Sequence, residues 1–172
     1  MNIFEFAMQK ERDAENFYRD LAGKAKSPGL RKIFNMLADA EIRHFEVVRH
    51  MQESAPDVPP ATILDDAVAT FREMRRNKDY DVGYEERQVE VYEKARAMEK
   101  ESCDFYTQQA EETDDETSAE IFRQLAGQES MHYRLVDHLA EFVIRPRLWF
   151  ENGEYSHIID QDRGTAFYPE KP

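Results

Sequence analysis

The segment "IFNMLADAEIRHFEVVRH", residues 33–50, recurs 88 positions later in the chain as "IFRQLAGQESMHYRLVDH", residues 121–138. The similarity extends further back, because residues 11–50 and 99–138 share 12 identical positions out of 40 without a gap. Two unrelated segments of ordinary composition would share roughly 2 or 3 positions over this length. The chain therefore contains two copies of one structural unit.

Both copies have the apolar spacing of amphipathic helices, with apolar side chains three and four positions apart. This spacing predicts four long helices, over residues 3–26, 28–53, 84–112 and 117–143. The segments "KSPGL" and "TDDET" supply the turn in each copy, and Ser27 and Pro28 are expected as the N-cap and first residue of the second helix. Each copy is thus predicted to be a helical hairpin.

A connection of about 30 residues joins the two hairpins and includes a short helix expected around Ile63–Arg75. Short loops make neighbouring helices antiparallel, whereas a connection of this length can cross the whole bundle. Residues 1–146 are therefore predicted to form an all-α four-helix bundle with a long crossover between its second and third helices. Residues 147–172 are expected to be an aromatic tail of the same domain, with one short helix near Leu148–Tyr155.

Five of the 12 identical positions carry a glutamate, a histidine or a tyrosine, and the rest are apolar. The pairs are Glu11 and Glu99, Tyr18 and Tyr106, Glu41 and Glu129, His44 and His132, and His50 and His138. A solvated helix face does not need such agreement, because most surface substitutions are nearly neutral. Charged residues nearby did change between the copies, as at Arg19 and Thr107. The recurrence therefore singles out these positions.

Helical geometry predicts which way the recurring side chains of the second helix point. At 100° per residue, Phe34 and Leu37 lie within about 40° of Glu41, and His44 lies about 60° away. Glu41 and His44 therefore share the apolar stripe that faces the core. His50 lies about 180° from Glu41, so it is not expected to be a ligand.

The other three long helices are also expected to carry recurring residues on the inner face. Tyr18 lies about 20° from Glu11 on the first helix, which places both on the inner face. By the repeat, the inner faces of the third and fourth helices carry Glu99, Tyr106, Glu129 and His132, while His138 is rejected together with His50. Four glutamates and two histidines are thus expected to meet in one core.

Burying four carboxylates together is very unfavourable unless positive charge compensates them. Two divalent cations would supply that charge, and a carboxylate-rich set with imidazole suits iron or manganese, with zinc as a further occupant. The predicted metal ligands are Glu11, Glu41, His44, Glu99, Glu129 and His132. One Glu from each of two helices and a Glu-x-x-His from each of the others is the pattern of di-metal carboxylate bundles.

At these residues the chain resembles the ferritin-like superfamily and, within it, the rubrerythrins. An E-x6-Y at 11–18 and 99–106 and an ExxH at 41–44 and 129–132 carry the resemblance, which covers residues 3–143. It implies a non-haem centre with two iron ions per chain, activity toward hydrogen peroxide or dioxygen in oxidative stress, and a homodimer. In this resemblance Tyr18 and Tyr106 match catalytic-site tyrosines that donate hydrogen bonds to the ligand carboxylates.

The chain departs from the typical rubrerythrin pattern at two places. Its single cysteine, Cys103, cannot build the four-cysteine iron centre of a rubredoxin-like module, so electrons are expected from an external rubredoxin-like donor. Ser102 stands where peroxidase-type members have an additional Glu, and Glu101 lies about 200° from Glu99. An iron-binding protein without catalytic turnover is therefore the alternative, and a structural bundle with zinc or no metal is a third hypothesis.

Composition narrows the classes of partner. The net charge of −13 disfavours nucleic acid and anionic membrane surfaces as partners. Hydrophobic residues at 41% and aromatic residues at 12% suffice for a packed core. No apolar run is long enough to span a membrane, and the N-terminus lacks the apolar segment of a signal peptide. We therefore expect a cytoplasmic protein with no haem and no cofactor besides the metal.

Overall fold

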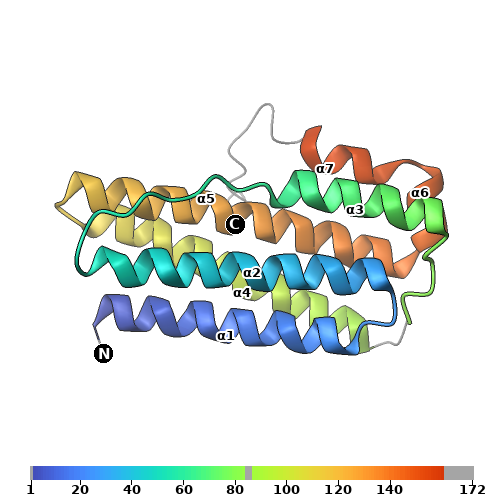
Figure 1. The fold of residues 1–172 in the computed structure, drawn as a ribbon, viewed down its shortest axis with the longest axis horizontal. Coiled ribbons are helices and arrows are strands. Elements are labelled where there is room, and N and C mark those ends of the chain that lie inside the picture. Colours follow the sequence, from blue (N-terminus) through green and yellow to red (C-terminus); the bar gives the residue numbers. More distant parts are fainter. Residues whose placement is uncertain (1, 84–86, 161–172) are drawn as a thin grey trace, which may run out of the picture.

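The computed structural model describes residues 2–83 and 87–160, and every regular element in these ranges is helical. The elements are α1 (Ile3–Lys24), α2 (Pro28–Met51), α3 (Ile63–Asn77), α4 (Arg87–Glu112), α5 (Glu116–Ile144), α6 (Pro146–Glu151), the 3₁₀ turn η1 (Glu154–Ser156) and α7 (His157–Asp160). Figure 1 shows α1 beside α2 and α4 beside α5, with the connection after α2 running back along the molecule to α3. The predicted all-α, ferritin-like bundle with a long crossover is confirmed.

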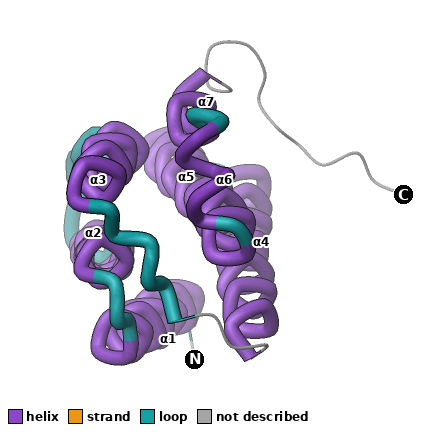
Figure 2. Tube along the Cα trace, turned by 90° about the vertical axis from the view of Figure 1, so that its right-hand side faces the viewer, coloured by secondary structure: helices purple, strands orange, loops and turns teal. Residues whose placement is uncertain are grey.

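The two hairpins face each other as two layers when the molecule is seen end-on (Figure 2). Helices α1, α2 and α3 lie in one layer, and α4 and α5 lie in the other. The inner stripes of four long helices therefore meet along one axis, as the apolar periodicity requires.

Equivalent caps begin the second helix of each hairpin. The Ser27 hydroxyl accepts a hydrogen bond from the Leu30 N–H at 3.1 Å, and Pro28 is the first residue of α2, as expected. The Asp115 carboxylate accepts one from the Ser118 N–H at 2.8 Å at the start of α5. Ser27 and Asp115 are themselves 88 positions apart, so the duplication includes the turns.

The observed helix ends differ from the predicted ends by one or two residues, as local patterns usually allow. Helix α1 ends at Lys24 because Ala25 already has extended backbone angles, and α2 ends at Met51. Helix α3 extends to Asn77, and Lys78 closes it in the left-handed conformation. The predicted start of the third long helix at residues 84–86 lies outside the described residues.

A close contact places α3 against the beginning of α2. A Cβ atom at Gly29 would lie 2.1 Å from Cγ of Met74, so only glycine allows this approach. The Asp79 carboxylate, just after α3, accepts hydrogen bonds from the Ser27 hydroxyl at 2.8 Å and the Gly29 N–H at 3.0 Å. The crossover is thereby fastened to the first turn of α2.

The short C-terminal helix expected near Leu148–Tyr155 is present as α6, which begins two residues earlier, and the chain continues through η1 and α7 back onto α3. Helices α6 and α7 flank a turn at Gly153, whose φ of 68° favours glycine. Trp149 is fully buried, with its ring centroid 4.6 Å from that of Phe71 and 5.2 Å from that of Phe142. The aromatic tail residues Phe167 and Tyr168 lie outside the described residues.

Two apolar clusters fill the bundle on either side of a polar layer. The larger one surrounds Leu37, Phe71 and Leu139, and the smaller one surrounds Val48, Tyr106 and Leu125. The helical turns between them carry the recurring Glu and His residues. These polar side chains are therefore enclosed by hydrocarbon at both ends.

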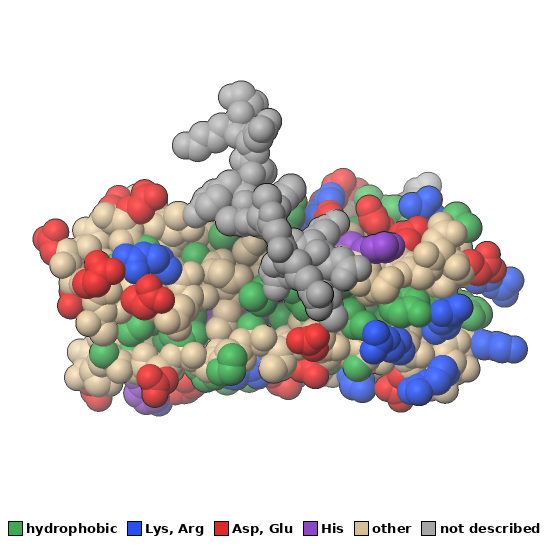
Figure 3. Space-filling view, turned by 90° about the horizontal axis from the view of Figure 1, so that it is seen from above, with side chains coloured by type: hydrophobic (Ala, Val, Ile, Leu, Met, Phe, Trp, Pro, Cys, Tyr) green, Lys and Arg blue, Asp and Glu red, His purple; other side chains and the backbone are tan. Residues whose placement is uncertain are grey.

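Charge is unevenly distributed on the surface. Figure 3 shows Lys and Arg side chains gathered toward the end of the molecule where α3 stops, and Arg75 and Arg76 belong to its last turn. Within the described ranges, no helix is both long enough and apolar enough to cross a membrane.

Candidate metal centre

Six recurring side chains meet in the polar layer of the bundle, each with at most 1% of its surface exposed. They are Glu11 from α1, Glu41 and His44 from α2, Glu99 from α4, and Glu129 and His132 from α5. One ligand atom from each of Glu41, His44, Glu129 and His132 lies within 4.8 Å of the others. The structure thus brings together all six residues that the sequence nominated.

His44 faces three carboxylates through Nδ1. This atom lies 2.8 Å from Oε1 of Glu129, 3.6 Å from Oε2 of Glu41 and 3.8 Å from Oε2 of Glu11. The first of these contacts crosses between the two hairpins.

His132 has the matching surroundings. Its Nδ1 lies 2.9 Å from Oε1 of Glu41, 3.5 Å from Oε2 of Glu129 and 3.6 Å from Oε2 of Glu99. Glu41 and Glu129 therefore lie near both histidines. Glu11 approaches only His44, and Glu99 approaches only His132.

The two recurring tyrosines connect the hairpins in the same reciprocal way. The Tyr18 hydroxyl on α1 donates a hydrogen bond to Glu99 on α4, and the Tyr106 hydroxyl on α4 donates one to Glu11 on α1. Burial and the adjacent carboxylates raise the pKa of both tyrosines well above the usual value, so each hydroxyl keeps its proton. The tyrosines therefore bind the two glutamates, Glu99 and Glu11, that each lie near one histidine rather than both.

Burial and neighbouring charges divide the four glutamates into two kinds. Burial, reinforced by neighbouring carboxylates, raises the pKa of Glu11 well above the usual range and that of Glu99 to about 8. Burial also opposes ionisation of Glu41 and Glu129, but the two histidines outweigh it and lower the pKa of both. Glu41 and Glu129 are thus carboxylates at neutral pH, whereas Glu11 and Glu99 hold protons.

The histidines complete the charge balance. Burial lowers the pKa of His44, but Glu129 and the other carboxylates raise it by a larger amount, so the pKa is well above the usual value. Glu41 and its neighbours do the same for the pKa of His132. Two imidazolium ions then balance two carboxylates. The cluster holds four more protons than it would with four carboxylates and two neutral rings: one on each of Glu11 and Glu99, and one additional proton on each histidine. Two divalent cations would balance four carboxylates equally well, with both rings neutral.

Several features of the cluster fit metal ions better than protons. Oε1 of Glu41, Oε2 of Glu129 and Nδ1 of His132 are buried without an aligned hydrogen bond, although Glu41 Oε1 and His132 Nδ1 are only 2.9 Å apart. The two imidazole rings stack with centroids 5.2 Å apart and planes 16° from parallel. Stacked imidazolium ions repel each other, whereas neutral rings that bind metal through Nδ1 do not. The donor set therefore fits a pair of divalent cations.

Other candidate residues lie away from this cluster. His50 is exposed, and His138 is half-buried, with a pKa that burial lowers. Glu101 is exposed, whereas Ser102 is buried at 5% exposure. Cys103 is half-buried, and burial raises the pKa of its thiol, which makes it a poor nucleophile.

One polar neighbour of the cluster was not found from the sequence. Gln128 places its Oε1 3.0 Å from Nε2 of His44, and its Nε2 donates to the Pro59 carbonyl at 2.8 Å. Its position directly before Glu129 was the available signal. The repeat concealed it, since the corresponding residue is Ala40.

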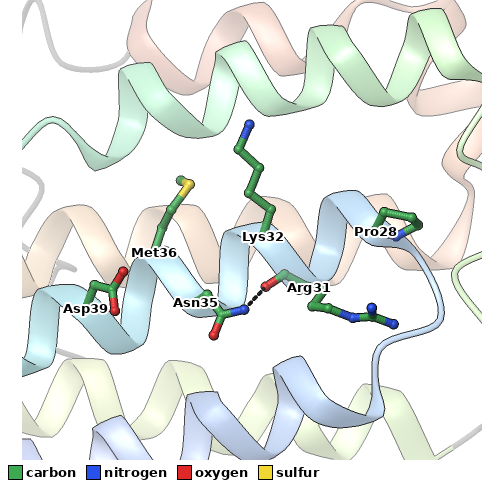
Figure 4. A pocket seen from close by; sticks show the side chains of 6 residues that line it. All are labelled: Pro28, Arg31, Lys32, Asn35, Met36 and Asp39. Carbon is green, nitrogen blue, oxygen red and sulfur yellow. Dashed lines mark hydrogen bonds between the residues drawn. The ribbon is translucent and has the colours of Figure 1, made fainter.

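A surface groove on α2 contains none of the six residues. It is lined by Pro28, Arg31, Lys32, Asn35, Met36 and Asp39 and opens between α1 and α3 (Figure 4). Within it the Asn35 side chain donates to the Arg31 carbonyl at 3.0 Å, and Lys32 pairs with Glu73 across the groove. The groove and the buried cluster are thus separate features.

Comparison with known proteins agrees with this geometry. The family model described as Rubrerythrin matches residues 2–140, which include all six clustered residues and both tyrosines. Comparisons with curated proteins and with solved structures found no match.

Proposed function

Because the chain belongs to the rubrerythrin family, we propose that it is a di-iron oxidoreductase that reduces hydrogen peroxide or dioxygen. The observation that carries the proposal is the paired geometry of the cluster. Each histidine Nδ1 faces three carboxylates, and two of those carboxylates face both histidines. An oxygen-rich set with one imidazole per metal suits iron, which can also change its oxidation state.

The distances suggest a role for each residue. Glu41 and Glu129 would be shared by the two iron ions, because each lies within 3.6 Å of both histidines. Glu11 would complete the ligands of the iron ion bound at His44, and Glu99 would complete those of the iron ion bound at His132. Tyr18 and Tyr106 would hold these last two carboxylates in place through their hydroxyl groups.

When bound, two Fe(II) ions would supply the two electrons that reduce hydrogen peroxide, with two protons, to two molecules of water. The residues of the chain position and protect this chemistry. Glu11 and Glu99, which hold protons in the metal-free cluster, would release them when they bind iron as carboxylates. The two apolar clusters exclude bulk water from the layer between them.

The proposal extends to partners. These 172 residues hold one cysteine, so repeated turnover would use electrons from a separate carrier such as a rubredoxin-like protein. A homodimer is part of the same proposal and is checked by the mass of the protein in solution.

The first test is anaerobic loading with Fe(II), followed by one equivalent of peroxide. The expected result is about two iron ions per chain and a near-ultraviolet ferric band that appears within seconds. Glu41→Gln should abolish both signals. Glu46→Gln is the matched control on the same helix, because Glu46 is partly exposed and pairs with Arg49. Iron that does not bind, or that peroxide does not oxidise quickly, would contradict the proposal.

A second candidate is a protein that holds iron without catalytic turnover. Buried Ser102, one turn beyond Glu99, favours it, because a hydroxyl replaces the additional carboxylate of peroxidase-type relatives. Steady-state peroxide reduction with a supplied rubredoxin and its reductase separates the two. Rapid single oxidation without sustained consumption of reductant would support iron holding.

A further inference from the structure

The hydrogen bonds of Gln128 determine which nitrogen of His44 carries a proton. The Gln128 Nε2 donates to the Pro59 carbonyl at 2.8 Å, which turns Oε1 of the same amide toward His44. Oε1 can only accept, so Nε2 of His44, 3.0 Å away, must be the donor. The lone pair of the neutral ring is then on Nδ1, the atom that faces the carboxylates.

Among the residues that the structure describes, His132 has no equivalent partner at the corresponding place. The repeat pairs Gln128 with Ala40, which is buried at 2% exposure and has no side-chain acceptor. The Pro59 carbonyl also has no counterpart, because it belongs to the crossover connection, which follows only the first hairpin. The two histidines thus face similar carboxylates through Nδ1, but the residues on the opposite side of each ring differ.

We propose that Gln128 is a positioning residue that holds His44 ready to bind metal through Nδ1, and that it makes the metal position at His44 the tighter of the two. The inference rests on the proposed function, since it assumes two metal positions. Hydrogen-bonded partners behind ligating histidines typically contribute 10- to 100-fold to metal affinity. The same amide ties the crossover to the metal position through Pro59.

The test compares three variants in anaerobic Co(II) titrations followed by visible absorption. Gln128→Leu removes the acceptor at similar volume, and Gln128→Glu keeps an acceptor oxygen. Gln124→Leu is the matched control one turn earlier on α5, because Gln124 is exposed and bonds only to Glu120. Wild type should bind Co(II) in a tight and a weak phase. Gln128→Leu should weaken the tight phase about 10- to 100-fold. Gln128→Glu, which keeps the acceptor but loses the donor to Pro59, should restore part of that affinity, and Gln124→Leu should leave it unchanged.

Nuclear magnetic resonance of ¹⁵N-labelled histidine gives a second readout that does not depend on activity. The Nε2-bound proton of His44 should exchange slowly in wild type and Gln128→Glu, and quickly in Gln128→Leu. A Gln128→Leu protein that titrates like wild type, or that weakens both phases equally, would overturn the proposal while leaving the di-metal site intact. If wild type binds no Co(II), the di-metal proposal itself fails, and unchanged proton exchange in Gln128→Leu would then also reject the role of Gln128.

Discussion

The α1–α2 and α4–α5 hairpins carry the same ligands but differ in the residues that surround them. Their four glutamates, two histidines and two tyrosines form reciprocal contacts across the interface. The copies differ three positions after the first ligand, where Ala14 corresponds to Ser102. They also differ directly before the second ligand, where Ala40 corresponds to Gln128. The paired cluster therefore needs identical ligands from both hairpins, whereas the residues that support those ligands differ between the copies.

The largest expected effect breaks the symmetry within the ligand set. Glu41→Gln and Glu129→Gln should each lose nearly all bound metal, because each carboxylate lies near both histidines. Glu99→Gln should lose about one of two metals, because Glu99 approaches only His132. Elemental analysis after Fe(II) loading measures the stoichiometry, and circular dichroism checks the fold. Exposed Glu101→Gln is the neighbouring control, and equal losses in all three ligand variants would refute the division into shared and unshared carboxylates.

The next largest effect is on the pH dependence of the free energy of unfolding, which should differ between the metal-free and the metal-bound protein. In the metal-free protein, Glu11 and Glu99 keep protons that the unfolded chain releases above about pH 4.5, and the two histidines keep protons above about pH 6.5. The folded state therefore binds more protons than the unfolded state, so the free energy of unfolding should fall as pH rises from 6 to 8. The slope is about 1.4 kcal/mol per pH unit for each retained proton.

Bound metal should remove this trend, because it displaces the same protons and binds more tightly as pH rises. Thermal unfolding of both forms at pH 6, 7 and 8 measures the difference. Glu99→Gln is the control, since it removes a group whose pKa is raised to about 8 and should flatten the metal-free slope. A metal-free protein that becomes more stable over this interval would contradict the assigned protonation.

A smaller effect tests the equivalence of the tyrosines. Tyr18→Phe and Tyr106→Phe should each destabilise the protein by about 1–3 kcal/mol, because each leaves a buried carboxyl oxygen without its donor. Each should also weaken one metal position about 10-fold. Chemical denaturation and Co(II) titration supply the two measurements. Clearly unequal losses would show that the hairpins differ at the tyrosines as well as behind the histidines.

The smallest effect concerns the paired caps. Ser27→Ala should cost about 1–2 kcal/mol, because its buried hydroxyl accepts from Leu30 and donates to Asp79. Asp115→Ala should cost less, because the carboxylate is exposed and its hydrogen bonds stay within the first turn of α5, mainly to Ser118. Thermal unfolding of the metal-free variants measures both. A larger loss at Asp115 would reverse the order that burial predicts.

The sequence alone predicted the bundle, its crossover and the six clustered residues. Helical periodicity depends on neighbours three and four positions away, so the inward faces of Glu41 and His44 could be read locally. The internal repeat then nominated Glu99, Glu129 and His132 by register. The helix ends and the fold of the segment after α5 were less accurate, because caps and the packing of Trp149 depend on contacts with distant residues.

What the sequence determined was therefore the set of ligands, because both copies must keep them in register for one cluster to form. Only the tertiary structure decided how they pair: which carboxylates serve both histidines, which tyrosine reaches across to which glutamate, and that Gln128 joins His44 to Pro59. These contacts join residues more than 60 positions apart, and their geometry depends on how two layers of helices settle against each other. Periodicity along one helix carries no information about that distance or register.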